Sequence, residues 1–351
     1  MSQKALLVTG IGDPLVLGDR PIPVPAPYEL LVEVTSAGLN PHDQKARDKE
    51  HLFTGQPLVL AHDVVGKIIQ TGSCQATTFT TGDHVFGMST FNPNLVNDSG
   101  GLQQYAVLDG RYVAKVTDAG LTDDEAATIP VNSVVAAVAV FDASGLGIPA
   151  PFSAAAGSFD YASQSLVVIG GASNCGRFVI QLAKFVGIGR IVAVAAASNT
   201  NELKSLGASH VVDRHASDVV QRVRKIVGDD LVYAVDTVNY GPHQALGVAV
   251  LSNTKKGVLA VLLPTNGDLD EHVKSSKKMG FERHFVYGGS NNYPDLMKQY
   301  WKHLPVWIRN GHVKPASSSV IYGLDPNQVN ECLDKYRDGT ATVRVVVRPN
   351  V

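Results

Sequence analysis

The sequence has 351 residues, of which 44% are hydrophobic and 18% are charged. This composition is typical of a globular protein with a substantial core, and it excludes disordered and fibrous chains. The formal net charge of -2 excludes nucleic acid as the main partner, because phosphate backbones are bound by basic surfaces. The length favours two domains over one.

Three cysteines, Cys74, Cys175 and Cys332, are too few and too far apart for a disulfide framework or a four-thiolate zinc site. This pattern indicates a reducing compartment. The N-terminal residues Met1–Lys4 lead into a strand-like stretch without the long apolar core of a signal peptide. The most apolar later stretch, Val131–Val140, is too short to span a bilayer. We therefore expect a cytoplasmic protein that does not enter a membrane.

Residues 1–125 predict a β-rich domain. Short runs separated by turns rich in proline and glycine predict strands, and these runs are Glu29–Val34, Asp63–Gln70, His84–Met88 and Gln104–Leu108. Such spacing is typical of a compact, partly closed β domain.

Residues 126–290 show a different pattern. The stretch Ser144–Ser165 is rich in glycine, proline and alanine and predicts a surface loop. The continuous apolar runs that follow it predict strands that are buried on both faces of a parallel sheet. These runs are Leu166–Ile169, Ile191–Ala197, Val211–Val212, Leu231–Val235 and Val258–Leu263. The helix-like segments between them are Arg177–Val186, Thr200–Leu206, Ser217–Val227 and His243–Leu251. The alternation predicts an α/β fold, a doubly wound Rossmann domain.

Residues 291–351 form a return segment. It contains an amphipathic stretch at Tyr300–Ile308, a predicted helix at Pro326–Arg337 and a final apolar strand at Thr342–Val347. Because a lone terminal strand usually pairs with an existing sheet, we expect this strand to join the first domain. The nucleotide domain would then be inserted into the catalytic domain.

The clearest chemical signal is the turn that follows the predicted strand at Leu166–Ile169 and opens a helix. The N–H groups at a helix start, together with the helix dipole, bind a pyrophosphate. The spacing Gly171-x-Ser173-x-x-Gly176 is the dinucleotide fingerprint with serine in place of its middle glycine. A turn with incidental glycines is the alternative, but the strand, the helix and the further βα repeats occur where the fold needs them. The residues predicted to bind the cofactor here are Gly170, Gly171, Ala172, Ser173, Asn174, Cys175 and Gly176.

The second predicted strand indicates which dinucleotide binds. NAD-binding proteins carry an acidic residue about 20 residues past the turn. Here the first acidic residue, Glu202, already lies in the following helix. Ser198, Asn199 and Asn201 can donate hydrogen bonds to a 2′-phosphate, and Arg214 can add positive charge or be a solvent-facing loop residue. We therefore predict NADPH as the cofactor.

Four segments together resemble the medium-chain dehydrogenase/reductase superfamily, and they are Ser36–Asp43, Leu58–Gly66, Gly82–Gly87 and Glu125–Pro130. They occur in the order and at the spacing of that family, and the resemblance covers nearly the whole chain. The branch that the chain most resembles is the zinc-free fungal one, related to quinone oxidoreductases and to the trans-acting enoyl reductases of polyketide pathways. The resemblance implies a GroES-like β domain that encloses a Rossmann domain.

Zinc ligands of the family are missing from their usual positions. Zinc-dependent relatives carry a cysteine soon after the Ala-Gly pair, a His-Glu pair, and a second cysteine or aspartate. Here Leu39–Asn40 stands at the first position, and no cysteine occurs from residue 75 to residue 174. His62 followed by Asp63 cannot complete a tetrahedral site alone. We therefore predict no metal, and we expect this pair to form hydrogen bonds in the core.

The resemblance also implies where cofactor and substrate bind. It places the loop that starts at Asn40 beside the nicotinamide ribose, and Val131 near the substrate in a cleft between the domains. Leu262 and Leu263 would present backbone groups to the carboxamide, and Val286–Ser290 would line the substrate pocket. The residues assigned to the cofactor on this basis are Asn40, Pro41, Asp43, Val131, Leu262 and Leu263.

A reductase must activate its electrophile as hydride arrives. In an enone or enoyl thioester, negative charge builds on the carbonyl oxygen and the α-carbon is then protonated. In an aldehyde, the carbonyl oxygen receives both the negative charge and the proton. Candidate catalytic donors are His42, Lys45 and Tyr287, with water as the alternative. His42 can instead be a loop residue that contacts cofactor or solvent.

The sequence as a whole predicts an NADPH-dependent, metal-independent reductase of an activated C=C or carbonyl group in a small or polyketide-like substrate, as in secondary metabolism. An NADPH:quinone reductase and a non-catalytic nucleotide-binding sensor are the alternatives. A polyketide synthase or its carrier protein is a candidate partner, and the protein is expected to be a monomer or a homodimer.

Overall fold

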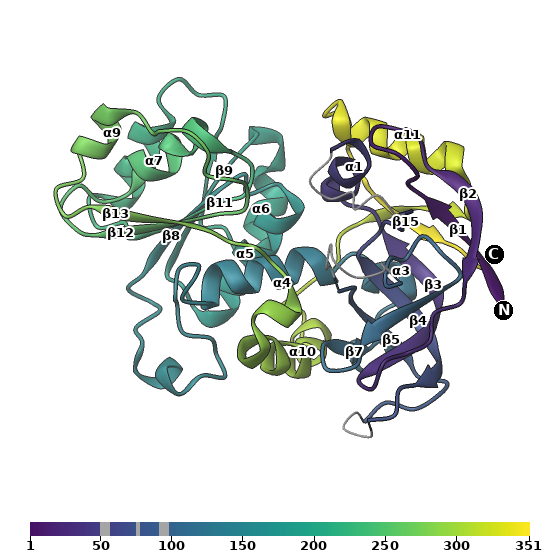
Figure 1. Cartoon of the computed structure of the whole chain (residues 1–351). Helices are drawn as coiled ribbons and strands as arrows, with labels where there is room; N and C mark the ends of the chain where they lie inside the picture. The colour runs from purple at the N-terminus through teal and green to yellow at the C-terminus, as the bar shows by residue number, and fades with distance from the viewer. Residues whose placement is uncertain (50–56, 75–77, 91–97) are drawn as a thin grey trace. The chain divides into compact units, whose positions relative to one another are not determined.

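The computed structural model describes residues 1–49, 57–74, 78–90 and 98–351 (Figure 1). The chain forms two compact units, one built from Met1–Val131 with Gly289–Val351 and the other from Asn132–Gly288. The second unit is therefore inserted into the first along the sequence.

The first unit is built on a seven-stranded sheet with the order β14-β15-β3-β4-β5-β7, and β6 pairs with β3. Its strands are β3 (Glu29–Gly38), β4 (Asp63–Thr71), β5 (His84–Met88), β6 (Tyr105–Asp109), β7 (Val113–Lys115), β14 (Ser318–Tyr322) and β15 (Arg344–Arg348). A separate antiparallel pair is formed by β1 (Ser2–Leu7) and β2 (Val16–Pro21). Strand β15 pairs antiparallel with β3, which confirms the predicted return of the C-terminal strand to the first domain.

Helices of the first unit are α1 (Pro41–Asp48), α2 (Val116–Ala119), α3 (Asp123–Ala126), α10 (Pro294–Arg309) and α11 (Pro326–Arg337), while α4 (Pro130–Phe141) runs from the first unit into the second. Helix α11 packs against α1. It begins at Asp325, whose carboxylate accepts hydrogen bonds from the N–H groups of Asn327 and Gln328, with Pro326 at its first position. The predicted helix at this place is confirmed.

The second unit holds a six-stranded parallel sheet with the order β10-β9-β8-β11-β12-β13. Its strands are β8 (Ser165–Ile169), β9 (Arg190–Ala195), β10 (His210–Asp213), β11 (Tyr233–Asp236), β12 (Gly257–Val261) and β13 (Phe281–Phe285), and its helices are α5 (Asn174–Val186), α6 (Thr200–Leu206), α7 (Val219–Val227), α8 (Ala245–Val250) and α9 (Glu271–Ser275). The chain passes from β8 to β9 on one side and later to β11 on the other, so the strand order reverses at β8. This is the doubly wound arrangement that the sequence predicts.

Within the described part of the chain, one helical stretch, Asp123–Phe141, is long and apolar enough by composition to cross a membrane, although a turn at residues 127–129 separates α3 from α4 inside it. It is longer than the apolar run at Val131–Val140 because α3 and α4 follow each other closely. Of its most apolar window, 83% is buried within the folded chain. This degree of burial is typical of a helix in the core of a folded protein.

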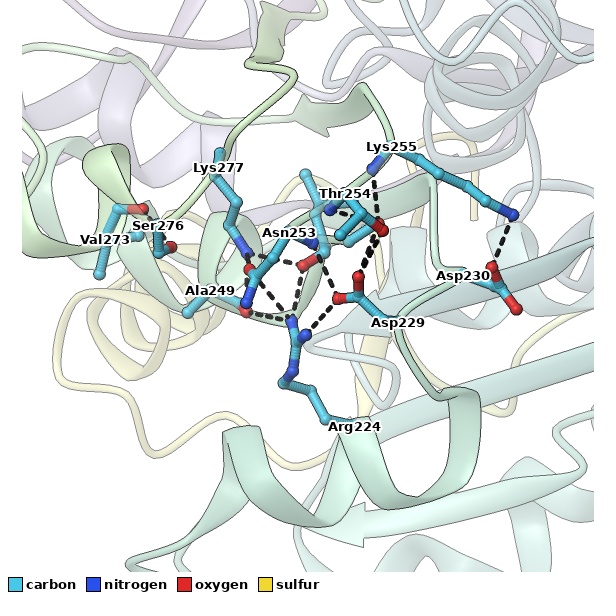
Figure 2. Close-up of polar contacts among 12 residues, drawn as sticks. Arg224, Asp229, Asp230, Ala249, Asn253, Thr254, Lys255, Val273, Ser276 and Lys277 are labelled. Carbon is cyan, nitrogen blue, oxygen red and sulfur yellow. Dashed lines mark hydrogen bonds and ion pairs between the residues drawn. The ribbon is translucent and has the colours of Figure 1, made fainter.

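Two cationic side chains, Lys277 and Arg224, bind the backbone carbonyls at the C-terminal end of α8 (Figure 2). The ammonium of Lys277 donates hydrogen bonds to the carbonyl of Leu251, at 2.6 Å, and to the side-chain oxygen of Asn253, at 2.9 Å. The guanidinium of Arg224 donates to the same Leu251 carbonyl at 2.8 Å and pairs with Asp229. Burial and the neighbouring Arg224 charge lower the pKa of Lys277 to about 8. The cluster satisfies carbonyls that a helix end leaves unpaired.

Candidate cofactor and active site

Parallel strands bring their carboxyl ends to one edge of the second unit's sheet. The turn from Gly170 to Gly176 follows β8, Ser198 and Asn199 follow β9, and Arg214 follows β10. Leu262 and Leu263 follow β12 at the same edge. Ligands of doubly wound sheets bind at this edge, beside the strand where the order reverses. The structure thus brings these predicted cofactor residues together.

The glycines of the turn are required by close packing. Gly170 has a φ of +74°, and a Cβ atom there would lie 2.5 Å from the Thr237 hydroxyl oxygen. A Cβ atom on Gly176 would lie 2.3 Å from the carbonyl oxygen of Gly170. Ser173, at the middle position of the fingerprint, begins helix α5, because its hydroxyl accepts a hydrogen bond from the Gly176 N–H at 3.0 Å. The serine therefore fixes the start of the helix.

Thr237 holds the turn and was missed by the sequence reasoning. Its hydroxyl lies 2.8 Å from that of Ser173 and donates to the carbonyls of Ile169 and Gly170, each at 3.0 Å. The residue directly follows β11, so it ties the end of that strand to the turn after β8. A single threonine after a strand carries no sequence pattern that could have revealed this role.

Other turn residues are partly accessible. Ala172, Asn174 and Cys175 are half-buried, and the Cys175 thiol donates to the side-chain oxygen of Asn132 at 3.2 Å. Because α5 leaves its first N–H groups without partners inside the helix, the turn can bind an anion such as a pyrophosphate.

The end of β9 lies beside Arg214, whose N–H donates to the Ala195 carbonyl at 2.9 Å. The Arg214 side chain is exposed, as are Ser198 and Asn201, while Asn199 is half-buried. No carboxylate occurs from residue 190 to residue 201. These groups therefore offer hydrogen-bond donors and one cation at the place where an NAD site needs an acid.

At the other side of this edge, one backbone group of Leu262 and one of Leu263 already form hydrogen bonds within the protein. The Leu262 N–H donates to the Asp236 carbonyl at 3.0 Å, and the Leu263 carbonyl accepts from the Gln244 amide at 3.0 Å. Tyr287, two residues beyond β13, is 48% exposed, and partial burial raises the pKa of its phenol. A phenol with a raised pKa stays protonated at neutral pH.

A buried polar network lies at the start of α1 in the first unit. The carboxylate of Asp63 accepts hydrogen bonds from the Asn40 side-chain amide at 2.7 Å and from the Val131 N–H at 2.6 Å, and it forms an ion pair with Arg344. Arg344 also donates to the Asn40 side-chain oxygen at 3.0 Å. Burial raises the pKa of Asp63, and the Arg344 charge and the Asn40 hydrogen bond oppose the rise. The network fixes Asn40 and Val131, and it agrees with the core role expected for Asp63.

The remaining predicted residues of this loop lie on α1. Pro41, at its first position, is exposed, and Asp43 is buried, with its carboxylate accepting from the N–H groups of Asn40 and Ala61. Lys45 is half-buried, and burial together with the charge of Lys49 lowers its pKa.

His42 on α1 and His62 before β4 form a pair of imidazoles whose ring centres lie 5.1 Å apart. His62 is buried, and its Nδ1 lies 2.6 Å from the Ser89 hydroxyl. Burial lowers the pKa of each histidine to about 4. Both rings are therefore neutral at neutral pH, and each can act as a hydrogen-bond donor or acceptor but not as an imidazolium.

The fit of a zinc ion can be tested on these residues. Within the described ranges, the one group with three potential metal ligands is His42, Asp43 and His62, whose ligand atoms lie within 4.8 Å of one another. Both oxygens of Asp43 already accept backbone hydrogen bonds, and no thiolate belongs to the group. Two imidazoles and a carboxylate are the protein ligands of some catalytic zinc sites, which add a water as the fourth ligand, so the composition of this group does not by itself decide against zinc. The absence of a metal stays a prediction that metal analysis can test.

Comparisons with known proteins assign the chain to a family. Residues 26–118 match the alcohol dehydrogenase GroES-like domain, and residues 175–302 match the zinc-binding dehydrogenase family. These two matches together cover more than half of the chain. The chain belongs to the medium-chain dehydrogenase/reductase superfamily. It is therefore an oxidoreductase of this superfamily, and the family resemblance stated from the sequence is confirmed.

Curated relatives align along most of their length. The chain is 29% identical over 324 residues to the trans-enoyl reductase himH of Aspergillus japonicus, covering 91% of this chain and 89% of the relative. It is 27% identical over 313 residues to a zinc-type alcohol dehydrogenase-like protein of Staphylococcus epidermidis, covering 88% and 87%.

Solved structures share the fold. The CurK enoyl reductase matches with a TM-score of 0.75 at 19% identity, over 99% of each chain. A Rhizobium etli protein whose structure is described as that of a zinc-dependent alcohol dehydrogenase matches with a TM-score of 0.80 at 22% identity, over 100% of this chain and 99% of that one. At these identities the structures establish the fold alone, and the predicted combination of a GroES-like domain with a Rossmann domain is confirmed.

Proposed function

We propose that the protein is an NADPH-dependent, metal-independent reductase that transfers hydride to an activated C=C group, an enone or enoyl thioester, of a small or polyketide-like substrate. The observation that carries the proposal is the carboxyl edge of the second unit's sheet. It combines a phosphate-binding turn with a β9 end that has no carboxylate. The similarity to trans-enoyl reductases favours C=C over C=O as the reacting group.

NADPH would be held by the residues of this edge. The turn from Gly170 to Gly176 would bind the pyrophosphate at the start of α5. Ser198, Asn199 and Asn201 would donate to the 2′-phosphate, and Arg214 would supply charge. When bound, NADPH supplies the hydride, and the protein supplies orientation and polarisation.

His42 is the proposed donor to the substrate carbonyl. Its Nε2 atom is buried and lies 3.5 Å from the Asp43 carboxylate, and no residue within the described ranges is hydrogen-bonded to it. Because its pKa is lowered to about 4, the ring is neutral and would donate through N–H rather than release a proton as a cation. Lys45 and the protonated phenol of Tyr287 are the candidate sources of the proton for the α-carbon.

A substrate panel tests the proposal. Loss of NADPH absorbance is followed with an enone, an enoyl thioester, an aldehyde and a quinone, with NADH in parallel. We expect the enone or the thioester to oxidise NADPH faster than the aldehyde or the quinone. Turnover with quinones alone would replace the proposal by a quinone reductase. Cofactor binding without any turnover would leave a non-catalytic nucleotide-binding protein.

Two further measurements test the finer parts. Arg214→Ala should weaken NADPH binding far more than NADH binding, and an equal effect would remove Arg214 from the 2′-phosphate site. Metal analysis should find no stoichiometric zinc, and a chelator should leave activity unchanged.

The location and the partners are also proposals. We propose a cytoplasmic location, because Cys74, Cys175 and Cys332 are all free thiols. Turnover that requires a substrate tethered to a carrier protein would add such a protein as a partner. Light scattering would separate a monomer from a homodimer.

A further inference from the structure

An ion pair links the phosphate-binding turn to the helix that follows β9. Arg177, in the first turn of α5, donates from Nε to one Glu202 oxygen at 2.7 Å and from Nη2 to the other at 2.9 Å. Its remaining nitrogen, Nη1, donates to the carbonyl of Ala172, inside the turn. The guanidinium therefore joins the two segments between which the adenosine half of the cofactor is proposed to bind.

Glu202 is the one carboxylate in this part of the sequence. No other acidic residue occurs from residue 190 to residue 212. The side chain of Glu202 is 47% exposed, and it lies in the first turn of α6, directly after Ser198 and Asn199. The hydrogen bonds and charge of Arg177 lower the pKa of Glu202, so the carboxylate is ionised at neutral pH.

An ionised carboxylate near this position has a known effect on dinucleotides. It accepts hydrogen bonds from the ribose hydroxyls of NADH and repels the 2′-phosphate of NADPH. Here both Glu202 oxygens are occupied by one guanidinium in a bidentate arrangement, which neutralises the carboxylate and fixes its direction. The acid is thereby removed from competition for the ribose.

We propose that Arg177 is a positioning residue that sets the preference for NADPH by holding Glu202 away from the adenosine ribose. The inference rests on the proposed function and deepens it, because it names a residue outside the predicted donors that decides between the two cofactors. Without Arg177, the freed Glu202 carboxylate repels the 2′-phosphate and accepts from the ribose hydroxyls.

The test compares NADPH and NADH affinities of the full-length protein by titration of nicotinamide fluorescence. Arg177→Met should weaken NADPH binding about tenfold, which corresponds to about 1.4 kcal/mol, and should leave NADH binding unchanged or tighter. The double variant Arg177→Met/Glu202→Gln should regain most of the NADPH affinity, because the repelling charge is gone. An ion pair with side chains 25% and 47% exposed adds little to stability, so both variants are expected to fold.

A matched control is Arg222→Met, which removes an exposed arginine–aspartate pair from α7 of the same unit. It should change neither affinity. An equal loss of NADPH and NADH binding in Arg177→Met, without rescue by Glu202→Gln, would overturn the inference and leave a purely structural role. A wild-type protein that binds neither dinucleotide, or that prefers NADH, would instead overturn the proposed function itself.

Discussion

Replacing Arg344 by methionine would leave the carboxylate of Asp63 buried without its cationic partner. The two side chains are 1% and 0% exposed, so solvent cannot take over the role of the guanidinium. Removing one partner of a buried ion pair typically costs about 3–5 kcal/mol. Asp63 keeps hydrogen bonds from the Asn40 amide and the Val131 N–H, so we expect a loss of about 3 kcal/mol, near the lower limit of that range.

The assay is urea-induced unfolding followed by tryptophan fluorescence. Both tryptophans of the chain, Trp301 and Trp307, are buried in the first unit, as are Arg344 and Asp63, so the signal reports on the unit that carries the substitution. The difference in unfolding free energy between Arg344→Met and the wild-type protein should become smaller as the pH is lowered. Burial raises the pKa of Asp63, Arg344 opposes that rise, and the variant's carboxyl therefore takes up a proton at a higher pH.

Two variants control this experiment. Arg344→Met/Asp63→Asn removes the buried charge and should be more stable than Arg344→Met alone. Arg337→Met, at the last residue of α11, removes exposed ion pairs to Asp334 and Asp338, and it should cost less than about 1 kcal/mol. A loss below about 1 kcal/mol in Arg344→Met, or a double variant less stable than the single one, would refute the reasoning.

Three further predictions concern other parts of the molecule. Gly176→Ala should abolish dinucleotide binding, because its Cβ would lie 2.3 Å from the Gly170 carbonyl oxygen. The control is Gly157→Ala, where a Cβ meets nothing within 4 Å. Unchanged dinucleotide affinity in Gly176→Ala would contradict the assignment of the turn. Acid should destabilise the protein through His62, whose pKa of about 4 lies below the unfolded value of 6.5, so the unfolded state binds the extra proton between these values and stability falls as the pH drops through that window. Near pH 5 this histidine should account for a loss of about 2 kcal/mol, and in His62→Gln the urea midpoint should depend less on pH between about 5 and 7; an unchanged dependence would argue against a neutral buried ring. Lys277→Met should cost about 1–3 kcal/mol, measured by thermal or urea unfolding, because the carbonyls of Ala249 and Leu251 lose one of their two cationic donors; a neutral effect would show that Arg224 or water replaces the ammonium.

Much of the fold could be predicted because its strands carry strong local patterns. The run Leu166–Ile169 is continuously apolar and becomes β8, buried on both faces at the centre of the parallel sheet. Strand β13, Phe281–Phe285, was missed because Glu282, Arg283 and His284 occupy its middle. It lies at the edge of the sheet, where half-exposed positions accept charged residues. Edge strands carry a weaker apolar signal, so their detection needs the pairing partner.

The two halves of the candidate site also differed in how far they could be predicted from the sequence. The turn from Gly170 to Gly176 is local in sequence, so its glycine spacing could be recognised directly. The Asp63–Arg344 pair spans 281 residues, and it forms only because β15 pairs with β3 beside β4. A buried arginine at the start of an apolar strand such as Arg344–Arg348 is itself a signal, since such a cation requires a carboxylate partner. The sequence could not say which carboxylate it would meet.

Each unit of the protein contains an acidic side chain paired with an arginine, and the difference in burial predicts different roles. The Asp63–Arg344 pair is inaccessible to solvent, so its loss must appear as a loss of folding stability. The Arg177–Glu202 pair is partly exposed, so water can solvate either partner after a substitution and stability changes little. What changes there is the charge presented to a bound dinucleotide. An Arg177 variant that lost stability as Arg344→Met does, with no change in cofactor preference, would contradict this division of roles.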